Sequence, residues 1–400
     1  MHCTRPITES VTWVGGCDRR LSRFENLFLI PNGVAYHSYL ITDEKTALMD
    51  TVDASISRQF NENVEYALHG RELDYLVINH VEPDHCANIE ALMLRYPNMK
   101  IVGNVKTHTI LSQFYDSDMA SRAVTVKDGD TLSLGKHTLR FFTAPMVHWP
   151  EVMMTYEESE KLLFTADAFG GFGALDGRLF DDEVVLQGRW MDDVRRYYAN
   201  IVGKYGTQVQ MAMKKVAGLE IKILCPLHGL IWRSHIDLIW EKYQLWSKYL
   251  PEEKALAVFF GSMYGDTENA VNILTTALAE RGITNLRVYD VSSTPVDQLI
   301  GEVFRCSHLL IGCVTYNNGI YPAMANVLHD MKALTLQNRT VGIIQNGTWA
   351  PASGKLIQEE LAAMKGMTVL EPVVTLKSSL KPDSREQLLA LADAIAESMS

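Results

Sequence analysis

The sequence lacks the features that mark several large classes of protein. None of its six cysteines forms a Cys-x-x-Cys pair, which excludes a rubredoxin-like or ferredoxin-like cysteine cluster within these 400 residues. No apolar run approaches the roughly 20 residues that span a bilayer, and the first ten residues show no basic start followed by an apolar segment. We therefore expect a cytoplasmic protein with free thiols and no membrane partner.

Positive charge is also scarce. Lysine and arginine number 37 against 48 acidic residues, which gives a formal net charge of −11. Nucleic-acid binding requires a basic face, so nucleic acid is excluded as a general partner. The hydrophobic content of 47% and the charged content of 21% are typical of a folded globular protein. A chain of 400 residues exceeds one ordinary hydrophobic core, so we expect two domains.

Up to about residue 250, short apolar runs alternate with polar turns. Helical patterns at 208–219 and 235–250 lie between or after these runs, and Pro251 ends the second of them. Residues 251–254 then form a short linker. Four of the apolar runs predict strands that end in loops, at residues 46–53, 73–79, 138–145 and 161–167.

After the linker, the pattern changes to a repeat of strand, loop and helix. The apolar run at 255–260 precedes a small polar loop and a helical pattern, and residues 308–314 and 340–346 supply further buried strands. Such an alternation predicts a doubly wound parallel sheet. We therefore divide the chain into a domain of residues 1–250 and an α/β domain of residues 254–400.

Residues 79–85, with the sequence NHVEPDH, place four potential metal ligands directly after a predicted strand. These ligands are His80, Glu82, Asp84 and His85. A loop can fold several side chains around one point, whereas a straight strand directs alternate residues to opposite faces. A single histidine in such a place is usually a structural residue, but four potential ligands within six positions favour a metal site.

Three later residues occupy similar places. His148, Asp167 and His228 each follow an apolar run that predicts a strand, and turn residues follow each of them. Each alone would be weak evidence. Taken with the first cluster, they provide four histidines and three carboxylates, which suffice for two metal ions that share a bridging carboxylate.

This arrangement resembles the metallo-β-lactamase fold, an αββα sandwich whose usual ligand loop is His-x-His-x-Asp-His. Most members of that group are zinc hydrolases that activate water. The present sequence has Glu82 where the usual loop has its second histidine. An anionic carboxylate in place of a neutral imidazole hardens the site, and this favours iron over zinc.

The loop after residues 255–260 resembles the flavodoxin loop that holds the phosphate of flavin mononucleotide (FMN). It precedes a predicted helix, whose N-terminal amides form an anion site. A hydroxyl-rich turn of this kind can equally be ordinary helix capping. Two further loops, at 315–322 and 346–354, fall after the next predicted strands and carry aromatic side chains suited to a planar flavin. The predicted FMN-binding residues are Ser262, Met263, Tyr264, Gly265, Asp266, Thr267, Thr315, Tyr316, Asn317, Asn318, Gly319, Asn346, Gly347, Thr348, Trp349 and Ala350.

Taken together, the chain closely resembles the flavodiiron proteins over essentially its whole length. The resemblance implies one iron held by His80, Glu82 and His148, and a second iron held by Asp84 and His228, with Asp167 as the bridge. It leaves open whether His85 binds iron, because in some members the matching histidine turns away from the metal.

The family resemblance also implies a function and partners. Such proteins reduce dioxygen to water, nitric oxide to nitrous oxide, or both, with electrons from a donor such as rubredoxin or a reduced deazaflavin. In family members a head-to-tail homodimer, or a dimer of such dimers, brings the flavin of one subunit to the iron pair of the other. Two alternatives remain at this point: a zinc hydrolase with an accessory flavin domain, and an electron carrier whose first domain is inert.

Overall fold

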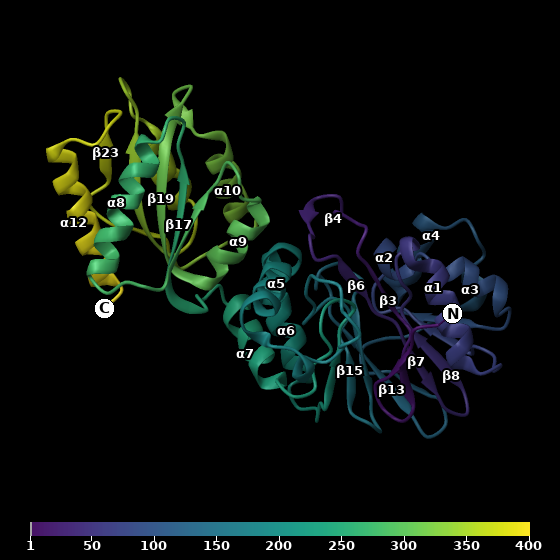
Figure 1. The fold of residues 1–400 in the computed structure, drawn as a ribbon. Coiled ribbons are helices and arrows are strands. Elements are labelled where there is room, and N and C mark those ends of the chain that lie inside the picture. Colours follow the sequence, from purple (N-terminus) through teal and green to yellow (C-terminus); the bar gives the residue numbers. More distant parts are fainter. Residues whose placement is uncertain (1) are drawn as a thin grey trace. The chain divides into compact units, whose positions relative to one another are not determined.

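The chain folds into two compact units that divide between Tyr243 and Gln244 (Figure 1). The computed structural model describes residues 2–400. Both units combine helices with strands, so the expected α/β class is confirmed. Among the described residues, no helix is both long enough and apolar enough to cross a membrane.

The first unit is an αββα sandwich of two sheets. One sheet has seven strands in the order β1-β2-β7-β8-β9-β10-β11, and the other has five in the order β12-β13-β14-β15-β16. The strands are β1 Arg5–Pro6, β2 Val11–Trp13, β3 Gly16–Asp18, β4 Arg23–Phe24, β5 Phe28–Leu29, β6 Val34–Tyr36, β7 Tyr39–Thr42, β8 Thr46–Met49, β9 Tyr75–Val77, β10 Lys100–Gly103, β11 Ala123–Thr125, β12 Thr131–Ser133, β13 Thr138–Thr143, β14 Met153–Glu157, β15 Leu162–Phe164 and β16 Ile223–Cys225.

Helices follow or separate these strands. The α-helices that begin in this unit are α1 Ser57–Leu68, α2 Pro83–Cys86, α3 Ile89–Arg95, α4 Val105–Phe114, α5 Met191–Tyr197, α6 Gly206–Val216 and α7 Ile236–Ser247. The 3₁₀ and π turns are η1 Ala54–Ile56, η2 Ala120–Arg122, η3 Asp181–Glu183, η4 Leu186–Trp190, η5 Tyr198–Val202 and η6 Gly203–Tyr205.

The inner faces of the two sheets meet in a buried core. Tyr39 of β7 and Phe164 of β15 place their ring centroids 5.3 Å apart, and the Tyr39 hydroxyl donates a hydrogen bond to the Pro226 carbonyl at 2.7 Å. Thr155 of β14 donates to the Asn79 side chain after β9, again at 2.7 Å. These contacts fix the positions of the strand ends of the two sheets relative to each other. A site built from residues of both sheets requires such fixed positions.

The second unit is a doubly wound sheet in the order β18-β17-β19-β21, with β22 and β23 both pairing with β21. The main strand pairs are parallel. Its elements are β17 Glu253–Gly261, α8 Asp266–Glu280, β18 Leu286–Asp290, α9 Val296–Arg305, β19 Cys306–Tyr316, β20 Gly319–Ile320, α10 Pro322–Ala333, β21 Thr340–Asn346, α11 Ser353–Ala362, β22 Thr368–Val369, β23 Val374–Leu376 and α12 Pro382–Ser398.

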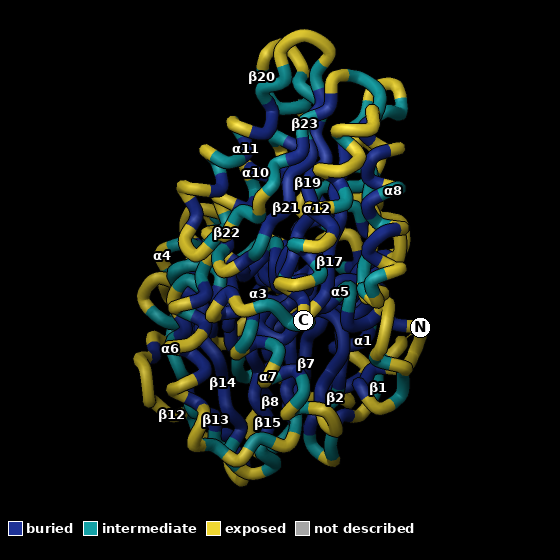
Figure 2. The backbone as a smooth tube through the Cα atoms, turned by 90° about the vertical axis from the view of Figure 1, so that its left-hand side faces the viewer, coloured by how far each residue is buried: buried dark blue, intermediate teal, exposed yellow. Residues whose placement is uncertain are grey.

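The central strands of this second sheet are covered on both faces, which explains their continuous apolar sequences. Residues 255–261 of β17 are all buried, as are residues 308–313 of β19. Figure 2 shows these strands in dark blue, while the helices beside them carry exposed residues. The helices α8 and α12 pack on one side of the sheet through a shared apolar cluster that includes Leu274, Leu391 and Ile395.

The strands predicted in the first unit are present, but each is shorter than the apolar run that predicted it. Residues 46–53 form a strand only over Thr46–Met49, and residues 161–167 only over Leu162–Phe164. Beyond β8, Asp50 accepts hydrogen bonds from the backbone amides of Asn79 and His80, and beyond β15, Asp167 belongs to the site described below. In the second unit, the run at 340–346 coincides with β21.

Two glycines allow the loops after β15 and β16 to touch through their backbones. Gly229, next to His228, adopts φ +75°, and a Cβ at this position would lie 2.6 Å from the Gly171 nitrogen. A side chain here would be strained by its left-handed conformation and would also collide with backbone. This contact fixes the distance between the loops that carry Asp167 and His228.

We expect Gly229→Ala to lower the free energy of unfolding of the first unit by about 2–4 kcal/mol, because it adds conformational strain and overpacking. Urea unfolding monitored by tryptophan fluorescence measures this change. Gly218→Ala is the matched control, since a Cβ there meets no atom within 4 Å. Equal stability of the two variants would contradict the role assigned to the glycine contact.

Candidate metal centre and flavin pocket

Residues at four strand ends form two adjoining groups of potential metal ligands. His80 lies between β9 and α2, and His148, Asp167 and His228 follow β13, β15 and β16. These three strands run in the same direction within their sheet, so their carboxyl ends meet at one edge. The first group contains His80, Glu82, His148 and Asp167, and the second contains Asp84, His85 and His228.

The local fold of residues 82–86 differs in one respect from a simple loop. Glu82 is the N-cap of the short helix α2, and Asp84 and His85 lie within its single turn. Pro83 occupies the first helical position, where its fixed φ suits the start of a helix. As a result, Glu82 belongs to the first group while Asp84 and His85 belong to the second.

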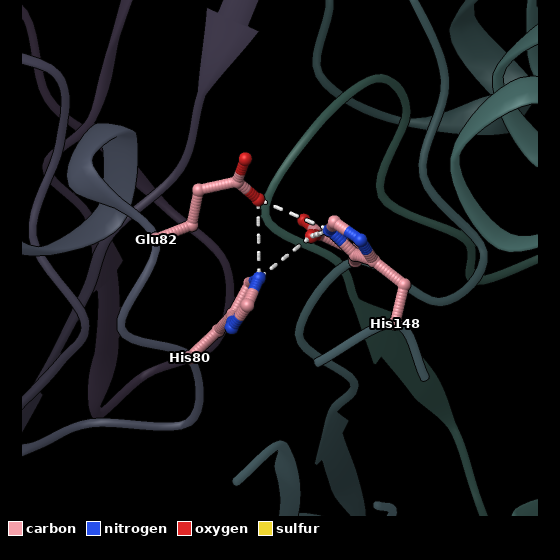
Figure 3. A group of neighbouring side chains, drawn as sticks. His80, Glu82 and His148 are labelled. Atoms are coloured by element: carbon pink, nitrogen blue, oxygen red, sulfur yellow. Dashed lines mark hydrogen bonds and ion pairs between the residues drawn. The ribbon is translucent and has the colours of Figure 1, made fainter. Parts of the chain in front are cut away.

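Within the first group, imidazole nitrogens and carboxylate oxygens face a common centre (Figure 3). His80 Nε2 lies 3.2 Å from Glu82 Oε2, and His148 Nε2 lies 3.0 Å from the same oxygen. Separations of about 3 Å are what two atoms show when both bind one metal ion at about 2.1 Å and nearly right angles. All three side chains are largely buried.

Asp167 connects the two groups through its two oxygens. Oδ2 lies 3.1 Å from His148 Nε2 and 3.4 Å from His80 Nε2 in the first group. Oδ1 lies 3.2 Å from His85 Nε2 and 3.6 Å from His228 Nε2 in the second. The carboxylate therefore presents one oxygen to each group, which is the geometry of a bridging ligand.

The second group leaves many buried polar atoms without hydrogen bonds. A buried polar atom without a partner costs about 1–3 kcal/mol, and lone pairs that face one another add repulsion. Among the described residues, the unpartnered atoms that face one another are Asp84 Oδ1 and Oδ2, Asp167 Oδ1, His85 Nε2 and His228 Nε2. A cation between them would satisfy these atoms, so the donor set fits a metal ion. His85 Nδ1, on the other side of its ring, is also buried without a partner in the described part of the chain.

The electrostatics of the cluster agree with this interpretation. Burial disfavours charged imidazoles, yet Asp84 and Asp167 raise the pKa of His85 to about 9. Asp167 and Glu82 likewise raise the pKa of buried His148 to about 9. Burial alone would raise the pKa of Asp167, but the adjacent histidines hold it well below its usual value. The ion-free ligand set thus favours added positive charge, which two metal cations supply.

A third histidine–glutamate group, away from the first two, is already satisfied by protein donors. His137 Nδ1 donates to Glu157 Oε1 at 2.9 Å, and the backbone amides of Ser159 and Glu160 donate to the same carboxylate. The Glu160 carboxylate accepts two hydroxyl hydrogen bonds from the N-terminal segment. This network stabilises the turn between β14 and β15.

A cavity of about 580 Å³ lies at the carboxyl ends of β17, β19, β21 and β23. All the residues predicted to bind FMN line it except Gly265 and Gly319. Gly265 instead shapes the first loop, with φ +93° and an amide that donates to Ser262 Oγ at 3.1 Å. The open N-terminus of α8 at the base of this loop suits a phosphate group.

Two large aromatic side chains at the rim of the cavity are exposed to solvent. Tyr264 is 92% exposed and Trp349 is 85% exposed. Such rings are usually covered, and a planar heterocycle between them would cover both. Together with the phosphate site at α8, they make this cavity fit FMN.

Several residues at these sites were not predicted from the sequence. Ser378, after β23, lines the flavin cavity and shares hydrogen bonds with Asn346 at 3.0 Å. Its position after a parallel strand was the available signal, because ligands of such sheets bind at the carboxyl ends. Glu151 and Tyr197 pack behind the metal ligands, but nothing in their local sequence indicates this.

Comparisons with known proteins agree with both halves of the structure. Residues 34–229 match the family model described as ODP family beta lactamase, and residues 258–390 match the flavodoxin model. Two solved structures align with TM-scores of 0.91. The rubredoxin oxygen:oxidoreductase of Desulfovibrio gigas is 30% identical, with 99% of this chain and 98% of that chain covered. The flavodiiron protein of Giardia intestinalis is 25% identical, with coverages of 100% and 99%.

Curated relatives extend over the whole chain. The nitric oxide reductase of Moorella thermoacetica is 31% identical, with 98% of this chain and 97% of that protein covered. The rubredoxin-oxygen oxidoreductase of Megalodesulfovibrio gigas is also 31% identical, with coverages of 100% and 98%. The fold and the two sites define a two-unit protein with a lactamase-like metal centre and a flavodoxin-like pocket. The chain belongs to the flavodiiron protein family.

Asp167→Asn removes the charge that both groups share while preserving side-chain size. We expect the variant to bind its second metal ion at least about tenfold more weakly, because an amide cannot offer an anionic oxygen to each of two cations. Equilibrium dialysis followed by elemental analysis measures this. Asp181→Asn, at a fully buried aspartate outside both groups, is the control. Two tightly bound ions in Asp167→Asn would refute the bridge.

Proposed function

We propose that this protein reduces dioxygen to water, nitric oxide to nitrous oxide, or both. The main observation behind this proposal is that the Asp167 carboxylate faces two ligand groups. The same chain also contains a flavin pocket. Glu82 in the first group supports iron over zinc, since it adds a hard anionic oxygen to the site. The names of two relatives, nitric oxide reductase and rubredoxin-oxygen oxidoreductase, support both gases as substrates.

Each predicted ligand receives a role in this proposal. His80, Glu82 and His148 hold one iron, and Asp84 and His228 hold the other, with Asp167 as the bridge. We assign His85 to the second iron as well, because its Nε2 faces Asp84 Oδ1 at 3.4 Å and Asp167 Oδ1 at 3.2 Å. In this chain, therefore, the histidine points toward the centre.

The flavin pocket provides the second redox group. We propose that FMN is held by the loops after β17, β19 and β21, with Ser378 as an additional contact. When bound, reduced FMN and a diferrous pair each store two electrons, which together supply the four that dioxygen requires. The reduction of two nitric oxide molecules to one nitrous oxide requires two.

Gas molecules need a path to the metal centre. A cavity of about 260 Å³ lies directly beside it, with the carboxylate-bearing residues Glu82 and Asp84 in its wall. Phe24 and Tyr36 add aromatic surface to its lining. We propose this cavity as the access route, since it is large enough for a diatomic molecule and leads to the ligands of both irons.

The assembly and donor are part of the same proposal. We propose a cytoplasmic head-to-tail homodimer, or a dimer of such dimers, with domains of residues 1–250 and 254–400. The free state of all described cysteines supports a reducing compartment. The rubredoxin in the relative's name supports a rubredoxin-type donor, and a reduced deazaflavin is the alternative donor.

Anaerobically prepared protein should contain two irons and one FMN per chain, because both donor sets are complete. Elemental analysis and flavin absorbance measure this content. The reduced protein should then consume both gases or one of them, as recorded with oxygen and nitric oxide electrodes. Stoichiometric zinc with little iron would instead support the zinc hydrolase.

A second test addresses the dimer. One variant, His80→Ala with His148→Ala, removes iron ligands, and the other, Ser262→Ala with Thr267→Ala, weakens the phosphate loop. After subunit exchange, verified heterodimers should regain gas reduction, because one intact flavin site then faces one intact metal centre. Each variant carried alone through the exchange protocol is the control. Continued inactivity of the heterodimers, or full activity of a dilute monomer, would contradict the head-to-tail arrangement.

A further inference from the structure

A buried glutamate lies directly behind one metal-facing histidine. His80 is fully buried, and its Nε2 faces Glu82 and Asp167, so its Nδ1 points away from the centre. Nδ1 lies 2.7 Å from Oε1 of Glu151, which is 1% exposed. When Nε2 binds a metal, Nδ1 carries the proton and donates it to this carboxylate in a charge-assisted hydrogen bond.

Glu151 is itself held in place by backbone contacts. Its Oε1 also accepts a hydrogen bond from the Val81 amide at 3.1 Å. Its backbone carbonyl accepts one from the side chain of Asn104, the N-cap of α4. Because the carboxylate is fixed to the same loop as His80, it restrains the orientation of the imidazole ring as well as its tautomer.

The corresponding histidine of the second group has a different partner. His228 Nδ1 donates to the backbone carbonyl of Ala35 at 2.8 Å, while its Nε2 lies 3.3 Å from Asp84 Oδ2. A neutral carbonyl polarises an imidazole less than a carboxylate does. His80 and His228 therefore differ in the charge of the group that accepts their Nδ1 hydrogen bond, although each group has one terminal carboxylate.

Building on the proposed diiron function, we propose that Glu151 is a positioning residue that strengthens electron donation by His80. The iron held by His80, Glu82 and His148 is consequently the one that favours the ferric state. The iron held by Asp84, His85 and His228 is the one reduced first. The asymmetry follows from the buried charge beside His80, because an anionic environment stabilises the more highly charged ion.

Glu151→Gln tests this, since it removes the charge with little change in shape. We expect the variant to bind two irons but to release one of them to a chelator about 10- to 100-fold faster than wild type. The lower of the two iron midpoint potentials should rise. A tenfold loss of ferric over ferrous preference corresponds to about 59 mV. Redox titration followed by electron paramagnetic resonance measures the potentials.

Glu157→Gln is the matched control. Glu157 is also fully buried and accepts a hydrogen bond from a histidine, His137, but lies in the third, structural group. It should leave iron release and both potentials unchanged. If Glu151→Gln behaves like this control, the proposal is overturned.

A measurement on the wild-type protein tests which iron favours the ferric state, even if Glu151→Gln fails to fold. Anomalous diffraction across the iron K edge, recorded on half-reduced crystals, assigns an oxidation state to each iron. The ferric ion is expected beside His80, and a ferric ion beside His228 or an even distribution would overturn the proposal. Wild-type protein without two irons would instead contradict the proposed function, so the two failures are distinguishable.

Discussion

The sharing of one buried carboxylate between two ligand groups is the constraint on which the first unit depends. Asp167 has one oxygen in each group, and it is almost completely buried. Buried anions and unpartnered imidazole nitrogens are costly unless cations occupy the space between them. The parallel strand ends and the backbone contact of Gly171 with Gly229 hold the ligands together against this cost.

The sites of the two units differ in burial and in charge. The metal centre is largely buried and rich in charge, which suits tightly bound cations whose oxidation state is set by surrounding anions. The flavin pocket is open, contains no lysine or arginine among the residues that line it, and exposes aromatic rings at its rim. Neutral donors at a helix N-terminus suffice for a phosphate, and an exposed ring edge suits electron exchange with other molecules.

Much of this organisation could be predicted from sequence because the relevant signals are local. The apolar runs located the strands, and ligand-type residues directly after them marked the functional edge of each sheet. Strand lengths were overestimated, since the polar ends of runs such as 161–167 leave the sheet to face the site. The flavin loops were found for the same reason, whereas Ser378 was missed because a lone serine after a short strand carries little signal.

By itself, the sequence determined the ligand types, the order of the two units and the presence of Glu82, since each depends on residue identity and position along the chain. The family resemblance already implied how most of the potential ligands divide between two metal ions. Only the tertiary structure decided that His85 lies with Asp84 and His228, and which oxygen of Asp167 faces which group. It also decided that Glu151 lies behind His80 although 71 residues separate them. Those relations depend on how two sheets pack, and no local pattern of residues encodes the direction in which a buried side chain points.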